Sequence, residues 1–166
     1  MRKEGKGFTL IELLVVISII GLLITTMMVA IGPYRKKARD VKRQFEIGQI
    51  GRFLTAGSCH VPDGGPGEYD LAEILEEMVA ANPQVRENVI KLPRDPKGGK
   101  DSRTLYYYVY AEDGGRGACA VYANLENAAA EVNLTNISVP TPGRGTGVFR
   151  GTEGWNGTDL YYQYGN

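Results

Sequence analysis

The chain has 166 residues and a mass of 18.1 kDa, which suits one compact domain with an appended segment and excludes a multi-domain enzyme. Its 19 Lys plus Arg balance 19 Asp plus Glu, and apolar residues make up 43% of the chain. Binding to duplex nucleic acid draws on a surplus of basic residues, so we predict no direct nucleic-acid partner.

An uncharged apolar run near the N-terminus predicts a membrane span. Residues 13–31 contain neither a charge nor a proline. As a helix they extend about 28 Å at ~1.5 Å per residue, close to the ~30 Å hydrocarbon thickness of a bilayer. Three other interpretations fit less well. A cleaved secretory signal has a shorter apolar core. A plain anchor does not explain Glu12, and a soluble helix that is apolar on every side needs a large domain around it.

Glu12 lies at the start of this apolar stretch. An ionised carboxylate in hydrocarbon costs on the order of 3 kcal/mol or more, so such a residue tends to have a partner. Lys6 is the only basic side chain nearby. Cleavage of the bond before Phe8 would create an α-amine four residues upstream, largely protonated near neutral pH because its pKa is about 8. We therefore expect this amine to be the partner of Glu12.

Residues 6–23, KGFTLIELLVVISIIGLL, resemble the N-terminal signature of type IV pilins and of the pseudopilins of type II secretion. In this resemblance a short basic leader ends in Gly7, and Phe8 begins the segment that leads into the apolar helix. The resemblance implies that a prepilin peptidase cuts between Gly7 and Phe8 and methylates the new amino terminus. It also implies polymerisation through the N-terminal helix, with Glu12 at the position of the family's glutamate.

Two partners are open to Glu12. Pairing with the Phe8 amine of a neighbouring subunit would join two charges out of water, and losing one partner of a buried pair costs roughly 3–5 kcal/mol. Such a pair would check the register of each added subunit. The alternative is the amine of its own chain, one helical turn away.

Further along the span, Ser18, Gly21 and Thr25 follow a spacing that favours close helix packing, although small residues are also common in membrane helices.

The basic residues on the two sides of the span indicate an orientation opposite to the one that other features of the sequence favour. They are Arg2, Lys3 and Lys6 before it, and Arg35, Lys36, Lys37, Arg39, Lys42 and Arg43 after it. A count of these flanks alone would place the C-terminal side in the cytoplasm. The leader and two cysteines favour the opposite, and we expect Asp40 to pair with Lys36 and Gln44 and so to weaken the basic cluster. The expected location is the inner membrane with the head outside the cytoplasm, and afterwards a periplasmic or extracellular filament.

The same helix is expected to continue as an amphipathic half. Its two apolar sides contain Tyr34, Ala38, Val41 and Phe45 on one, and Ile47, Ile50, Phe53 and Leu54 on the other. We expect the second side to pack under a sheet of the same chain and the first to meet neighbouring helices in an assembly. The alternative is that one or both sides only cover the head.

The remaining residues predict a small α+β head. Residues 58–67 suit a turn-rich loop, and Asp70 caps a short helix whose apolar stripe runs to Val79. A second short helix or turn starts at Asn82-Pro83. Residues 104–111 and 118–123 predict a β-hairpin, residues 160–164 a closing strand and residues 140–159 a mobile loop. Residues 91–127 also resemble the head of the G-type pseudopilins. The expected fold class is therefore α+β, with a long N-terminal helix packed on a small antiparallel sheet.

The two cysteines, Cys59 and Cys119, are a candidate disulfide in an oxidising compartment. Closing a loop of this length is worth roughly 4 kcal/mol in the chain-entropy model. The alternative is a pair of buried free thiols, which reducing and non-reducing gels would distinguish.

No catalytic, phosphate-binding or zinc motif appears, so we predict a protein that is not an enzyme and has no cofactor or resident metal. His60, the only histidine, is expected to be a solvent-exposed loop residue. A lesser alternative is a calcium site formed by some of the acidic residues Asp63, Glu68, Asp70, Glu112 and Asp113, whose spacing is not diagnostic.

These expectations divide the chain into a cleaved leader (1–7), a transmembrane and assembly helix (8–31), the amphipathic half of the same helix (32–57) and a globular head (58–166). The predicted function is that of a subunit of a type IV pilus-like filament. The alternatives are a pseudopilin of a short pseudopilus for protein export and an anchored binding domain that never polymerises. Expected partners are other copies of the chain, the prepilin peptidase, the inner-membrane assembly machinery and, before assembly, the lipid bilayer.

Overall fold

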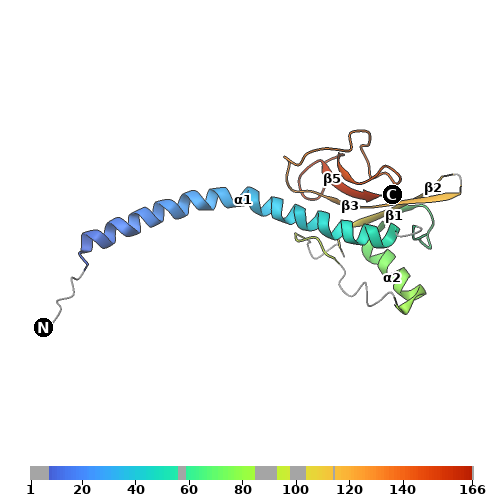
Figure 1. Ribbon diagram of the computed structural model, residues 1–166, viewed down its shortest axis with the longest axis horizontal. Coiled ribbons are helices and arrows are strands. Elements are labelled where there is room, and N and C mark those ends of the chain that lie inside the picture. Colours follow the sequence, from blue (N-terminus) through green and yellow to red (C-terminus); the bar gives the residue numbers. More distant parts are fainter. Residues whose placement is uncertain (1–7, 56–58, 85–92, 98–103, 114, 166) are drawn as a thin grey trace. The chain divides into compact units, whose positions relative to one another are not determined.

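A computed structural model describes residues 8–55, 59–84, 93–97, 104–113 and 115–165. Its elements, in chain order, are α1 (Leu10–Thr55), β1 (Gly67–Asp70), α2 (Leu71–Ala81), β2 (Tyr107–Asp113), β3 (Arg116–Asn124), β4 (Gly147–Arg150) and β5 (Leu160–Gly165) (Figure 1). This is the α+β, pilin-like class that the sequence predicts. The chain divides into two compact units, the first ending at Lys36 and the second beginning at Lys37.

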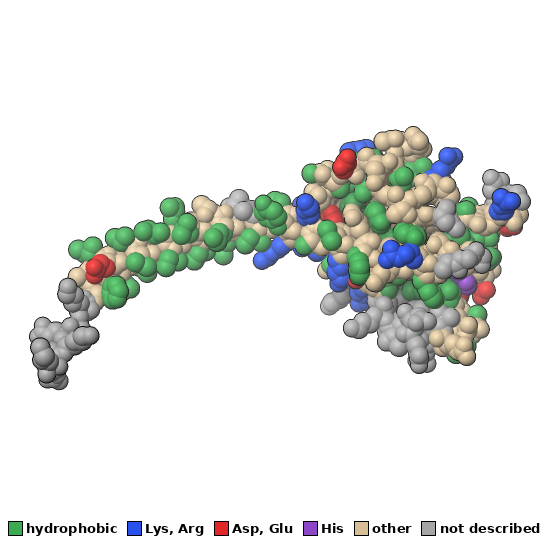
Figure 2. Space-filling model, in the orientation of Figure 1, with side chains coloured by type: hydrophobic (Ala, Val, Ile, Leu, Met, Phe, Trp, Pro, Cys, Tyr) green, Lys and Arg blue, Asp and Glu red, His purple; other side chains and the backbone are tan. Residues whose placement is uncertain are grey.

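The first unit consists of the N-terminal part of α1. Residues Leu10–Met28 form a helix that is long and apolar enough to cross a membrane, and none of it is buried within its own chain. Figure 2 shows hydrophobic side chains along this part of the helix, with lysine and arginine side chains following further along it. A helix that is apolar on every side needs an apolar surrounding, which the described residues do not provide here.

The second unit contains the remainder of α1, whose two sides differ in burial. Ile47 and Leu54 are buried in the head, whereas Val41 and Phe45 are exposed. The predicted division of this helix is therefore confirmed for these residues. It is wrong for Phe53, which is 37% exposed beside the buried Leu54. The helix ends at Thr55, and residues 56 and 57 of the expected amphipathic half lie outside the described part of the chain.

Gly51 allows α1 to approach the sheet closely. A Cβ atom at this buried position would overlap the ring of Tyr164 on β5. Glycine in a helix interior is unfavourable by roughly 1 kcal/mol relative to alanine. The close contact gives this glycine a packing reason, which a sequence pattern alone does not show.

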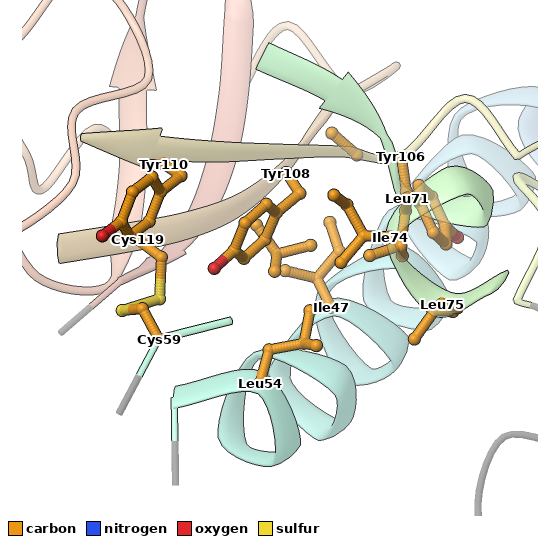
Figure 3. Close-up of a cluster of buried hydrophobic side chains, with 12 residues drawn as sticks. Ile47, Leu54, Cys59, Leu71, Ile74, Leu75, Tyr106, Tyr108, Tyr110 and Cys119 are labelled. Atoms are coloured by element: carbon orange, nitrogen blue, oxygen red, sulfur yellow. A yellow bond between two sulfur atoms is a disulfide. The ribbon is translucent and has the colours of Figure 1, made fainter. Parts of the chain in front are cut away.

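The five strands form one antiparallel sheet in the order β1-β2-β3-β5-β4. Side chains alternate between its two faces, as strand geometry requires. On one face, Tyr108, Tyr110 and Val121 pack with Ile47 and Leu54 of α1 and with α2 (Figure 3). On the other face lies a second cluster, formed by Tyr122, Phe149 and Tyr161 with the partly buried Tyr107, Val109, Leu134 and Ile137. The sheet is therefore covered on both sides.

Several predicted elements of the head are confirmed. The hairpin is present as β2 and β3, and the closing strand is β5. Asp70 caps α2, and its Oδ1 accepts a hydrogen bond of 2.8 Å from the backbone N–H of Ala72. The helix or turn expected from Asn82-Pro83 can be followed only to Gln84, because residues 85–92 lie outside the described part.

Two strands differ from the predictions. The loop expected over residues 140–159 contains β4, and β1 follows the turn at residues 63–64, where the sequence suggested only loop and cap. Both are four-residue strands. Strands this short have little periodicity of their own and form because a neighbouring strand supplies the hydrogen bonds. β4 pairs with β5 on one side, and Asn133 Oδ1 accepts the N–H of Val148 on the other.

Candidate assembly site at the start of the N-terminal helix

Thr9 and Glu12 form a reciprocal set of hydrogen bonds at the start of α1. The backbone N–H of Thr9 donates to Glu12 Oε2 at 2.8 Å, and the Thr9 hydroxyl donates to the same oxygen at 2.9 Å. The N–H of Glu12 donates in turn to Thr9 Oγ1 at 3.3 Å. This is a capping box, in which two backbone donors that the first helical turn leaves unpaired are satisfied by side chains.

The capping box occupies only one oxygen of Glu12. Oε2 accepts both bonds from Thr9, whereas no described residue donates to Oε1 or forms an ion pair with the carboxylate. The helix N-terminus favours a negative charge at this position, through the aligned peptide dipoles. Glu12 is thus held in a defined orientation with one oxygen available to a donor from outside the described residues.

The sequence contained a signal for this arrangement that we did not use. A threonine followed three residues later by glutamate, just before an apolar run, is typical of a capping box. Of the two residues of the expected cleavage site, Phe8 is 89% exposed and directly precedes Thr9, and Gly7 lies outside the described part.

The small residues expected to favour helix packing remain exposed in the single chain. Ser18 donates to the carbonyl of Leu14 at 2.8 Å, and Thr25 donates to the carbonyl of Leu22 at 2.8 Å. Their hydroxyl groups are therefore satisfied within α1. A Cβ atom at Gly21 would meet nothing within 4 Å. The helix is continuous through Gly21 and through Pro33, and a packing role for these positions stays a prediction.

The second unit contains a group of charged side chains that is paired within the chain. At its centre is Arg43 of α1, whose side chain is fully buried. Its guanidinium donates to Asp95 through Nε and Nη2, both at 2.7 Å. It also donates to Asp40 at 2.6 Å and to Glu126 at 2.6 Å. One cation therefore joins a residue of α1, the segment before β2 and the segment after β3; we call Arg43, Asp40, Asp95, Glu126 and Arg39 the Arg43 cluster.

The remaining bonds of the cluster complete its pairing. Arg39 donates to both carboxylate oxygens of Glu126, at 2.8 and 2.6 Å. Asp40 accepts the backbone N–H groups of Glu126 and Asn127. The hydrogen bond from Arg39, assisted by Arg43 and opposed by burial, lowers the pKa of Glu126 to about 2. Burial alone would lower the pKa of Arg43, but its hydrogen bonds to Asp95 and Glu126 raise it above the ordinary value.

This cluster corrects the expectation for Asp40. Helical spacing predicts pairing of Asp40 with Lys36 and Gln44, but its carboxylate is buried and faces Arg43 and the chain after β3. Arg43, which counted as part of the basic flank of the span, is likewise withdrawn from solvent. Sequence spacing within one helix could not reveal this, because Asp95 and Glu126 are 52 and 83 residues from Arg43.

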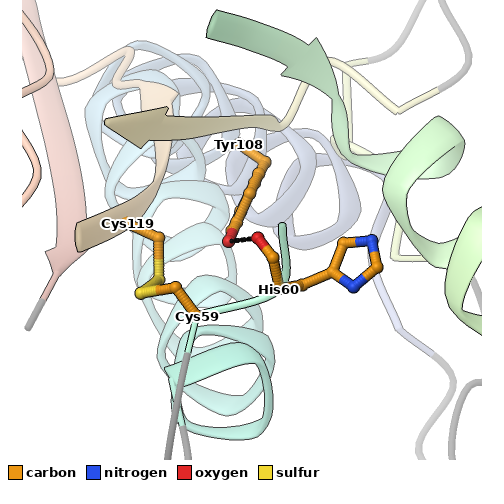
Figure 4. The surroundings of a disulfide bond; sticks show 4 residues. All are labelled: Cys59, His60, Tyr108 and Cys119. Carbon is orange, nitrogen blue, oxygen red and sulfur yellow. Dashed lines mark hydrogen bonds between the residues drawn. A yellow bond between two sulfur atoms is a disulfide. The ribbon is translucent and has the colours of Figure 1, made fainter. Parts of the chain in front are cut away.

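A disulfide joins Cys59 to Cys119 on β3, across a sequence separation of 60 residues (Figure 4). It connects the chain just after α1 to the centre of the sheet. Beside it, the hydroxyl of Tyr108 donates to the carbonyl of His60 at 2.6 Å. His60 lies in a loop as expected, but its side chain is only 21% exposed, with Nε2 3.3 Å from Glu77 Oε2. The contact with Glu77 on α2 partly covers the ring.

Of the acidic residues considered for calcium, Asp70 has other hydrogen-bond partners. Asp70 is occupied as the cap of α2 and as acceptor for the Thr104 hydroxyl at 2.9 Å. Within the described residues, no group of three or more His, Cys, Asp or Glu side chains is placed to hold a metal ion.

Comparison with known proteins adds one match. The prokaryotic N-terminal methylation motif matches residues 2–31, which include Phe8, Thr9 and Glu12. No curated protein and no solved structure matches the chain. The family with this motif consists of structural pilin-type subunits rather than enzymes. With the motif at the start of a long apolar helix and a pilin-like α+β head behind it, the chain carries the signature of the type IV pilin and pseudopilin prepilin-like proteins.

Proposed function

We propose that this chain is the structural subunit of a type IV pilus-like filament. It is made as a prepilin, cut between Gly7 and Phe8, methylated at Phe8 and polymerised through its N-terminal helix. The methylation motif supports this proposal, since its family implies processing by a prepilin peptidase, inner-membrane assembly machinery and polymerisation. The apolar segment of α1, which is not buried by any described residue, supports it as well.

The proposal rests on the carboxylate of Glu12, of which only one oxygen accepts hydrogen bonds from the described residues. Its Oε2 is fixed by Thr9, and its Oε1 accepts nothing from the described residues. Inside an apolar assembly a carboxylate with no cation is costly. The methylated amine of Phe8 on a neighbouring subunit supplies both the charge and a hydrogen-bond donor. Because the capping box already orients Glu12, little side-chain freedom is lost when the neighbour docks.

The disulfide supports an exported head. Disulfides form and persist in oxidising compartments such as the periplasm, and Cys59–Cys119 is the kind of bridge expected there. In this proposal the head lies outside the cytoplasm before assembly and belongs to a periplasmic or extracellular filament afterwards.

Mass spectrometry of the native protein tests the processing step. The expected N-terminus is methylated Phe8 in purified filaments. Ordered filaments whose subunits all retain Met1 to Gly7 would contradict the proposal. Electron microscopy of cells then examines the type of filament: long surface fibres are expected, and short fibres confined to the envelope would assign the subunit to a secretion pseudopilus instead.

Glu12→Gln tests the pairing. The substitution keeps the size of the side chain and removes the charge, so filament yield should fall by about tenfold or more, because an uncompensated charge in a buried pair costs roughly 3–5 kcal/mol. Cleavage before Phe8 should be retained. Glu73→Gln, on the exposed surface of α2, is the matched control and should assemble normally. Normal assembly of Glu12→Gln would instead favour a subunit in which the carboxylate serves only its own chain.

A further inference from the structure

We propose that three consecutive basic residues of α1, Arg35, Lys36 and Lys37, bind the headgroups of anionic phospholipids; we call them the basic segment. The inference rests on the membrane residence in the proposed function and adds a ligand to it. The segment is continuous in sequence with the apolar part of α1, which the membrane surrounds in that proposal.

The charge of the basic segment is not compensated by described acidic residues. All three side chains are exposed, and none forms an ion pair with a described residue. The nearest acidic residues that follow along the helix are Asp40 and Glu46. Asp40 is buried against Arg43, and Glu46 accepts the Tyr106 hydroxyl at 2.6 Å and lies 3.6 Å from Lys42. The Arg43 cluster thus removes the acid that would otherwise neutralise the segment.

The basic segment also lies at the right distance along the helix. The uncharged run ends at Ile31, and Arg35 to Lys37 follow within about 6–9 Å at ~1.5 Å per residue. Each headgroup layer of a bilayer is roughly 5–8 Å thick beyond the hydrocarbon. Tyr34, which is 72% exposed, precedes the segment, and tyrosine is typical of the membrane interface. Long basic side chains on such a helix extend toward phosphate oxygens.

A lipid headgroup fits these residues better than a protein surface does. Three adjacent positions on a helix point in different directions, about 100° apart, so one flat partner cannot contact all three. A layer of lipid headgroups surrounds the helix and contacts every side of it. Where the facing leaflet contains anionic lipids, they attract a basic segment beside a membrane-spanning helix.

Spin-label spectroscopy tests the inference on the full chain. The protein is reconstituted in phosphatidylcholine vesicles with trace spin-labelled phosphatidylglycerol or phosphatidylcholine, and the motionally restricted fraction of each label is measured. We expect phosphatidylglycerol to be preferred about twofold or more at low salt, and the preference to fall at high salt, where charges are screened over a shorter distance. The triple variant R35Q/K36Q/K37Q should lose the preference.

The matched control is R116Q/R144Q/R150Q, which removes the same charge from exposed positions of the head and should keep the preference. Equal restriction of the two labels around the unmodified chain overturns the inference, as does a preference that survives in R35Q/K36Q/K37Q or is lost in the control. The salt titration of the unmodified chain needs no variant. If the preference is absent and R35Q/K36Q/K37Q instead lowers cross-linking between copies in neutral vesicles, the ligand of the segment is a second copy of the chain.

The outcome is separable from that of the proposed function. Lipid selectivity requires no polymerisation, so the Glu12→Gln chain should show the same preference as the unmodified chain. Loss of selectivity in a chain that still forms filaments contradicts only the lipid inference. Retained selectivity in a chain that never forms filaments contradicts only the filament proposal.

Discussion

The start of α1 and the head differ in how their charged groups are paired. In the head, Arg43 is fully buried and is bonded to three carboxylates, two of which come from distant parts of the chain. At the start of α1, Glu12 lies in an exposed apolar segment and, among the described residues, receives bonds only from Thr9, three residues away. The head pairs its buried charges within the chain, whereas the start of α1 leaves a carboxylate oxygen of Glu12 without a described donor.

This difference indicates which region needs a partner. Buried charges are tolerated when they are paired and hydrogen-bonded, and the head meets that condition by itself. Among its described residues, no buried side-chain nitrogen or oxygen lacks a hydrogen bond. In the apolar segment, the described residues supply neither an apolar surrounding for the side chains nor a cation for Glu12.

Replacing the central cation of the head should have the largest effect. Arg43→Met leaves Asp40, Asp95 and Glu126 facing one another without their shared partner. The free energy of unfolding should fall by about 3–5 kcal/mol, the usual cost of breaking a buried pair. Denaturation of the full chain in detergent, followed by near-ultraviolet circular dichroism, measures it. The neighbouring Lys42→Met is the control, since its exposed ion pair is worth less than about 1 kcal/mol. Equal effects of both would refute a self-contained cluster.

Removing the disulfide should have the next largest effect. The double variant Cys59→Ser with Cys119→Ser opens a link across 60 residues, and the free energy of unfolding should fall by about 2–4 kcal/mol. The same denaturation experiment applies. A reducing agent should destabilise the unmodified chain by a similar amount and leave the double variant unaffected. If a reducing agent left the unfolding free energy of the unmodified chain unchanged, the disulfide would not be stabilising the head.

Acid should weaken the head through Glu126. Its pKa is about 2 in the folded protein against an ordinary value of 4.5, so its contribution is complete above pH 4.5 and is lost as the pH falls toward 2. Protonation should then reduce the free energy of unfolding by an amount on the order of 2–3 kcal/mol. Glu126→Gln should flatten this part of the stability curve, and Glu131→Gln, at an exposed position, should not. A curve that keeps its slope in Glu126→Gln would assign the acid sensitivity to other carboxylates.

The smallest effect is expected at the start of α1. Thr9→Val removes the hydroxyl half of the capping box, and loss of such a cap costs about 1 kcal/mol of local helix stability. Amide hydrogen exchange in detergent micelles should therefore become about fivefold faster over residues 10–13. The head should keep its unfolding free energy. Thr26→Val, whose hydroxyl donates to the Leu23 carbonyl, is the control and should leave these amides unchanged. Unchanged exchange in Thr9→Val would mean that the cap does not orient Glu12.

The sequence predicted the features that depend on local patterns. The apolar run, Glu12, the hairpin, the cap at Asp70 and the division of the second half of α1 can all be recognised from residues close together in the chain. The capping box at Thr9 was recognisable in the same way but was overlooked. The short strands β1 and β4 were not predictable by this route, because four residues carry too little periodicity and their partner strands decide whether they form.

The length, apolarity and N-terminal motif of the helix are properties of consecutive residues, and the sequence by itself determined them. The role of Arg43 was decided only by the tertiary structure. By its position it belonged to a basic flank beside a membrane span, but folding brings Asp95 and Glu126 to it from 52 and 83 residues away. Coulomb attraction depends on distance in space, and a linear pattern contains that distance only where the chain is locally regular.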